Sequence, residues 1–122
     1  MRSFKSKSGW IQQLQTLSPS AALFHEYMAL KNAGKWHEGT FREIYVPKFI
    51  REIRYSQDAA DMLNLLVKKD REGTNIAIAC FCPDETLCHR SIIAGLLQGA
   101  NCNVATETGN DYSYYHLMYL NA

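Results

Sequence analysis

Residues 76–97 read IAIACFCPDETLCHRSIIAGLL, and this stretch decides the fold prediction. An apolar run of strand length ends in Cys80-Phe-Cys82, a short polar loop follows, and Cys88 opens a segment whose apolar residues have helical spacing. A strand that runs through a loop into a helix points the N–H groups of the helix start at one place. That place attracts anions, because the first N–H groups of a helix have no partner within it.

The segments on either side extend this alternation. Residues 56–70 have the periodicity of an amphipathic helix, with Ser56 as its N-cap and two lysines near its end. Residues 71–74 form a turn, 75–80 a buried strand, and the helix that opens at Cys88 runs to Gln98 and ends at Gly99. Residues 102–107 suit a second strand, parallel to the first. The pattern predicts an α/β fold, a small Rossmann-like three-layer domain with a short, mostly parallel sheet.

Further helices are predicted outside this region. Ser18 followed by Pro19 is typical of a helix start, and the helix should end near Gly34 with a glycine C-cap. Residues 10–17 fit either a helix or a strand. Residues 111–120 also fit either, and we favour a helix there.

Residues 36–53 are rich in aromatic side chains. Thr40 and Glu43 match a capping box, which predicts a helix start at Thr40. Pro47 then breaks or restarts the helical pattern, and residues 49–53 predict a second short helix.

Composition limits the classes of protein to which the chain can belong. The 122 residues, 47% of them apolar and 20% charged, fit one globular domain over residues 1–122. The net charge of +1 gives no support for a broadly DNA-coating surface, and nucleic acid stays open as a partner. No apolar run approaches the ~20 residues that cross a bilayer, and no signal peptide is visible. We therefore predict a cytoplasmic protein without a membrane partner, whose four cysteines are mostly reduced.

The first functional hypothesis is a binding module for a phosphorylated small molecule or a nucleotide. Arg90 would bind the anion with its forked guanidinium, and Ser91 would add a hydroxyl donor. A cation in the first turn opposes the helix dipole, and a bound anion would explain its presence. The alternative is that Arg90 pairs with Asp84 or Glu85 and holds the loop closed.

The second hypothesis is an enzyme that uses the same site, with Cys88 or Cys82 as nucleophile and His89 as acid and base. The spacing differs from that of cysteine phosphatases, which place the cysteine six positions before the arginine. A third hypothesis is a zinc-stabilised interaction domain that uses Cys80, Cys82, Cys88 and His89. Because structural zinc sites usually have wider cysteine pairs, we predict no metal and no cofactor.

Three more residues are candidate ligand contacts. Arg42 and Tyr45 belong to an aromatic and basic cluster that could stack a base and hold a phosphate, although such clusters more often form core. Glu107 could contact a ribose hydroxyl or pair with Arg90. The tyrosines of residues 112–119 could form a homo-oligomer contact or cover the sheet.

The cysteine-rich loop resembles a known family. Cys80-Phe-Cys82, the loop of residues 83–87 and Cys88-His89-Arg90-Ser91 at a helix start are similar to the signature of the bacterial and phage family "domain of unknown function 488" (DUF488). Residues 17–20 (Leu-Ser-Pro-Ser) and the later Phe41 and Tyr45 match it more loosely. The resemblance implies a small Rossmann-like α/β fold and no settled activity. Many members have an acidic residue where Cys82 stands, and the family's usual N-terminal strand is not visible here.

Overall fold

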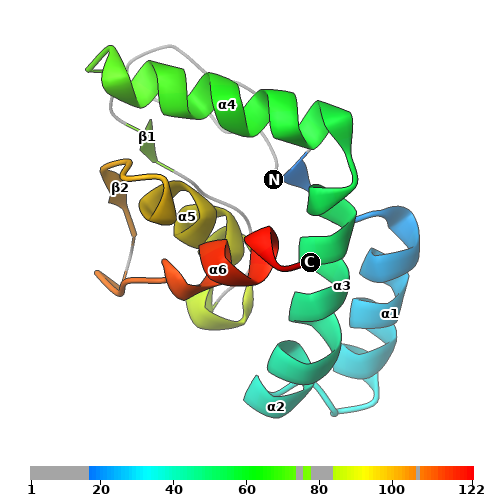
Figure 1. Ribbon diagram of the computed structural model, residues 1–122. Coiled ribbons are helices and arrows are strands. Elements are labelled where there is room, and N and C mark those ends of the chain that lie inside the picture. Colours follow the sequence, from blue (N-terminus) through cyan, green and yellow to red (C-terminus); the bar gives the residue numbers. More distant parts are fainter. Residues whose placement is uncertain (1–16, 74–75, 78–83, 107) are drawn as a thin grey trace, which may run out of the picture.

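The computed structural model describes residues 17–73, 76–77, 84–106 and 108–122 (Figure 1). Helices make up most of this part of the chain. In order, the elements are α1 (Ala21–Asn32), α2 (Glu38–Thr40), the π-helical turn η2 (Phe41–Tyr45), α3 (Val46–Arg54), α4 (Gln57–Arg71), β1 (Ile76–Ala77), the 3₁₀ turn η3 (Glu85–Leu87), α5 (His89–Gly99), β2 (Val104–Ala105) and α6 (Tyr114–Leu120).

The predicted Rossmann-like three-layer domain is wrong. Within the described residues, β1 and β2 are the strands, and each has only two residues. They pair in parallel, Ile76 with Val104 and Ala77 with Ala105, so the predicted direction of this pairing is confirmed. Two such short strands cannot form a layer for helices to cover. The fold over these residues is therefore a helical assembly with one short parallel strand pair at its edge (Figure 1).

The position of α5 explains this outcome. All of its residues from His89 to Leu97 are buried, and α6, α3 and α4 pack around it. A helix that is apolar on every side must be enclosed, whereas a helix that covers a sheet leaves one face in water. The sequence pattern predicts a helix that lies on a sheet, but α5 itself occupies the centre of the core, behind α6 in Figure 1.

Two glycines let α6 and the segment before it approach α5 closely. A Cβ atom at Gly95 would overlap the carbonyl oxygen of Tyr112, and one at Gly99 would overlap the side chain of His116. These glycines lie four residues apart and therefore on one face of α5. The predicted end of this helix at Gly99 is confirmed.

The first helix begins two residues later than predicted. Ser20, rather than Ser18, is the N-cap of α1, and its Oγ accepts from the N–H of Leu23 at 3.2 Å. Ser20 also donates from Oγ to Glu52 of α3 at 2.5 Å, which fixes α1 beside α3. The predicted glycine at the other end is confirmed, since Gly34 has a φ of +70°.

The predicted capping box at Thr40 is wrong. His37 caps α2, and its Nδ1 accepts from the N–H of Thr40 at 3.3 Å. Thr40 cannot cap because its hydroxyl turns back and donates to the carbonyl of Lys35 at 2.7 Å. Pro47 restarts the pattern at the beginning of α3, where the preceding π turn bonds the N–H of Val46 to the carbonyl of Phe41.

Two other predicted helices are confirmed. Ser56 caps α4 and its Oγ accepts from the N–H of Ala59 at 3.2 Å. The C-terminal segment forms α6, as favoured. Residues 10–16 lie outside the described part of the chain. In the described part, we find no helix with the length and apolar character needed to span a membrane.

Candidate functional site

The predicted site residues of the Cys-His-Arg-Ser motif meet at the start of α5. Cys88 is the N-cap and 2% exposed, and Arg90 is 4% exposed in the first turn. The Sγ of Cys88 lies 3.7 Å from the Nδ1 of His89. Ser91 donates from Oγ to the carbonyl of Cys88 at 2.8 Å, which tightens the first turn. The motif therefore forms one buried cluster and is not exposed to bulk solvent.

In the part of the chain that the structure describes, a side-chain cap is present at the start of some helices, whereas α5 has none, like α3 and α6. Ser20, His37 and Ser56 each accept a backbone N–H with a side-chain atom at the starts of α1, α2 and α4. No side-chain hydrogen bond of this kind forms at Cys88 among the described residues. The first N–H groups of α5 are thus not capped by the residue that begins the helix.

A buried carboxylate lies just before this helix. The Oε2 of Glu85 in η3 accepts from the hydroxyl of Tyr112 at 2.8 Å and from that of Thr108 at 2.6 Å. The backbone N–H of Cys88 donates to the carbonyl of Glu85 at 3.2 Å. Glu85 therefore joins the loop before α5 to the segment before α6.

Aromatic rings connect η2 with the motif. Phe41 and Tyr45 stack with centroids 5.5 Å apart, Tyr45 and Phe49 with centroids 5.9 Å apart, and the ring of Phe49 lies 5.6 Å from that of His89. Tyr45 is buried, so its ring has a packing role in this row. Arg42 lies elsewhere: its guanidinium is exposed and pairs with Glu38 one helical turn earlier.

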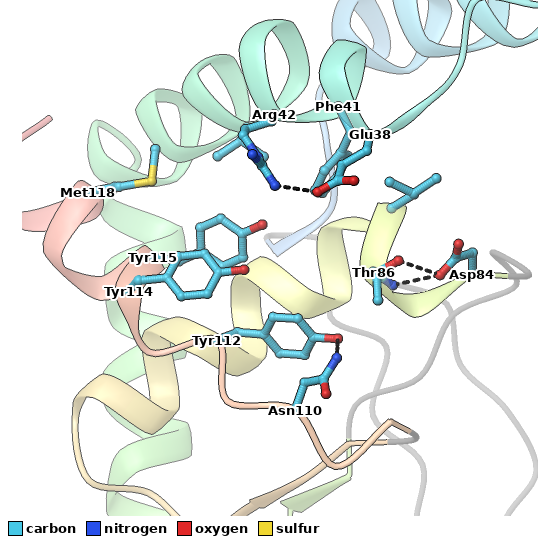
Figure 2. Close-up of a pocket in the computed structure, with 12 residues that line it drawn as sticks. Glu38, Phe41, Arg42, Asp84, Thr86, Asn110, Tyr112, Tyr114, Tyr115 and Met118 are labelled. Atoms are coloured by element: carbon cyan, nitrogen blue, oxygen red, sulfur yellow. Dashed lines mark hydrogen bonds and ion pairs between the residues drawn. The ribbon is translucent and has the colours of Figure 1, made fainter.

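Arg42 borders a pocket of about 670 Å³, which we call the tyrosine pocket (Figure 2). It lies between the α2–η2–α3 segment, the η3 turn and the chain around α6. Its lining consists of Glu38, Phe41, Arg42, Val46, Asp84, Thr86, Leu87, Asn110, Tyr112, Tyr114, Tyr115 and Met118. In Figure 2, the three tyrosine rings lie on one side of the space and the Glu38–Arg42 pair on the other.

Tyr115 links this pocket to the motif. Burial raises the pKa of Tyr115, a hydrogen bond with Tyr114 raises it further, and a hydrogen bond with the Ser91 side chain opposes the shift. Burial is also the main cause that raises the pKa of Tyr112. Both hydroxyls are therefore neutral at physiological pH and act as hydrogen-bonding groups.

Sequence reasoning missed several residues of this region. It named Glu85 only as a partner for Arg90, and it treated the tyrosines of residues 112–115 as an oligomer contact or a cover. The sequence favours a helix over residues 111–120, but α6 begins only at Tyr114, and nothing in the local pattern predicts a pocket beside Tyr112 and Tyr115. Cys80, Cys82 and Glu107 lie outside the described residues, so their predicted roles stay predictions.

The zinc hypothesis is likewise untested, because two of its four ligands are Cys80 and Cys82. In the described ranges, no group of three or more histidine, cysteine, aspartate or glutamate residues could hold a metal ion.

Comparison with known proteins gives a family. The sequence profile of a family described as "Active DUF488-N3 subclade" (DUF488-N3a) matches residues 2–101. The chain belongs to the DUF488 family. The resemblance found at the Cys-His-Arg-Ser motif is thereby confirmed, and the motif falls inside the matched range. No curated protein and no solved structure matches this DUF488 chain at a significant level.

Proposed function

We propose that this DUF488 protein binds a small anionic ligand of the phosphorylated or nucleotide-like class at the start of α5. The observation that supports this most directly is the buried cluster of Cys88, His89 and Arg90 at a helix start that Cys88 itself does not cap. Helix N-termini of this kind hold phosphate groups through their backbone N–H groups.

The charge of Arg90 supports an anion over a neutral ligand. A guanidinium in the first turn lies at the positive end of the helix dipole, where a cation is unfavourable. Burial adds a further cost, which hydrogen-bond acceptors and negative groups beside the guanidinium offset. A phosphate satisfies both conditions, because it accepts forked hydrogen bonds from Arg90 and accepts from the N–H groups of the first turn.

The test is a titration of uniformly ¹⁵N-labelled protein with inorganic phosphate, AMP and ADP-ribose, followed by NMR. We expect the amide signals of residues 89–91 to shift most, and calorimetry to show binding about tenfold weaker in Arg90→Lys, because lysine lacks the forked donor. Arg51→Gln, at an exposed position of α3, is the matched control and should bind as the wild type does. If none of the three probes shifts residues 89–91, the proposal is wrong, whether or not the Arg90 variant folds.

A second candidate function is a cysteine-dependent enzyme at the same place. The contact of 3.7 Å between the Cys88 Sγ and the His89 Nδ1 favours it, as does the word "Active" in the family's description. The imidazole of His89 would take the thiol proton, and the thiolate would attack an electrophilic atom of the ligand. The leaving group would then receive the proton from the imidazole, and water would release the product from sulfur.

Alkylation with iodoacetamide followed by peptide mapping tests this candidate. We expect Cys88 to react at least about tenfold faster than Cys102 at neutral pH although both are buried, because His89 would take the proton of the Cys88 thiol, whereas burial raises the pKa of the Cys102 thiol and keeps it protonated. His89→Gln should slow the reaction of Cys88 and leave that of Cys102 unchanged. Equal rates for the two cysteines in the wild-type protein would rule out an activated Cys88.

A further inference from the structure

We propose that the tyrosine pocket holds a planar heteroaromatic ring with a hydrogen-bonding edge, such as a nucleobase, stacked on Tyr114. At about 670 Å³ the pocket is large enough for a nucleoside. The ring would be the base of the ligand proposed above. That the ring and the anion at α5 belong to one molecule rests on the proposed function.

The floor of the pocket is apolar and fixed. Phe41, Val46, Tyr112 and Tyr115 are all buried there, so they present surface to a ligand without having to rearrange. Such a floor favours a flat apolar face over a hydrated, flexible chain.

Tyr114 supplies the stacking surface. Its side chain is 52% exposed, yet its ring is held against that of Tyr115, with centroids 4.4 Å apart and planes tilted by 52°. A ring that is both accessible and already positioned loses little freedom when a second ring stacks on it. Stacking of a base on an aromatic side chain is worth about 1–3 kcal/mol.

The rim supplies hydrogen bonds for the edge of such a ring. The amide of Asn110 is oriented by a bond of 3.4 Å from its Nδ2 to the hydroxyl of Tyr112. Across the pocket, the Glu38–Arg42 pair offers an acceptor and a donor side by side (Figure 2). Nucleobases carry donors and acceptors in the same alternation, whereas a purely apolar ring would leave these groups without partners.

The charges of the rim indicate where the phosphate of a nucleotide would not bind. Glu38 and Asp84 carry two negative charges against the one positive charge of Arg42, so this rim does not favour a phosphate. The start of α5, which favours a phosphate, lies nearby. Leu87 of the pocket directly precedes Cys88, and Tyr115 forms a hydrogen bond with Ser91.

The experiment measures binding of the four ribonucleosides, which lack a phosphate, by saturation-transfer NMR and by quenching of tyrosine fluorescence. We expect at least one nucleoside to bind, about tenfold more weakly in Tyr114→Ala and within about twofold of the wild type in Tyr114→Phe, which keeps the ring. Tyr55→Ala is the matched control, because Tyr55 is 74% exposed and does not line the pocket.

Three results would overturn the inference: no nucleoside binds, Tyr114→Ala leaves binding unchanged, or tetramethylammonium competes as well as the best nucleoside. The last result would show that the acidic rim and the rings hold an organic cation instead. A different result would show that the proposed function is wrong while this inference holds. In that case nucleosides bind in a Tyr114-dependent manner, while phosphate leaves the amide signals of residues 89–91 unchanged.

Discussion

At the scale of single residues, buried polar groups in this protein are held by hydrogen bonds between segments far apart in the sequence. Glu85 bonds to Thr108 and Tyr112, more than twenty residues later. Tyr112 in turn donates its backbone N–H to the side chain of Gln98 at 2.8 Å. Because a buried acceptor that loses its donor retains its full desolvation cost, these bonds make the region around α5 sensitive to single substitutions.

Tyr115 should make stability depend on pH in the alkaline range. Its pKa is raised in the folded state, chiefly by burial, so the unfolded chain loses this proton first, near pH 10. The stabilisation is therefore complete below about pH 10 and is lost as the pH rises above it. We expect Tyr115→Phe to remove up to about 1.4 kcal/mol per pH unit of this decline in the free energy of unfolding, measured with urea between about pH 8 and about pH 11.

Tyr55→Phe is the control for this measurement, since Tyr55 is largely exposed and should keep the wild-type slope. A slope that is the same in Tyr115→Phe and in the wild type would contradict the prediction.

At the scale of elements, two serine caps differ in what else they bind. Ser56 caps α4 through one bond. Ser20 caps α1 and also bonds to Glu52 of α3 through both its hydroxyl and its backbone N–H, at 2.5 and 2.9 Å. The cap of α1 is therefore also a tertiary contact, which is one reason why its position could not be assigned from local sequence.

We predict that Ser20→Ala lowers the free energy of unfolding by about 2 kcal/mol, against about 1 kcal/mol for Ser56→Ala, because it removes a cap and a charge-assisted bond together. Chemical denaturation of the two variants and of Glu52→Gln measures this. A double-mutant cycle between Ser20 and Glu52 should give a coupling energy above about 0.5 kcal/mol. Additive effects of the two substitutions would argue against the tertiary role of Ser20.

The close approach of the chain around α6 to α5 gives a second prediction at this scale. Alanine favours a helix over glycine by about 1 kcal/mol, so Gly95→Ala would stabilise an isolated α5. In the protein the new methyl group would overlap the backbone of Tyr112, and overpacking costs about 1–3 kcal/mol. We expect a net loss of stability in thermal unfolding, and an increase in the melting temperature would show that the two segments can separate at no cost.

At the scale of the whole molecule, a single helix organises the core. The helices α3, α4 and α6 surround α5, and the β1–β2 pair lies at the edge of this assembly (Figure 1). The tyrosine pocket also depends on this arrangement, because its walls come from three separate stretches of the chain.

Substitutions in α5 and α6 should therefore have unequal effects. Ile92 is fully buried in α5, whereas Leu117 of α6 is 63% exposed. We predict that Ile92→Ala lowers the free energy of unfolding by about 2–5 kcal/mol and that Leu117→Ala changes it by less than about 0.5 kcal/mol. Urea unfolding compares the two, and similar losses would mean that α6 buries its outer face in solution.

Features that depend on neighbouring residues could be predicted from the amino-acid sequence. Helical periodicity, the serine cap at Ser56 and the glycine at Gly34 placed α4, α5 and the end of α1, because caps and turns are decided within a few residues. The Cys-His-Arg-Ser motif located the candidate site at the start of α5 and pointed to the DUF488 family, and the parallel direction of the strand pair was correct.

Three features depend on tertiary contacts: helices enclose α5, the sheet within the described residues has only two short strands, and Ser20 and His37 rather than Ser18 and Thr40 cap their helices. An apolar segment has the same pattern whether helices or strands surround it, because burial depends on partners distant in the sequence. The same reason explains why the buried bonds of Glu85 and the tyrosine pocket could not be predicted: both join segments that meet only when the chain folds.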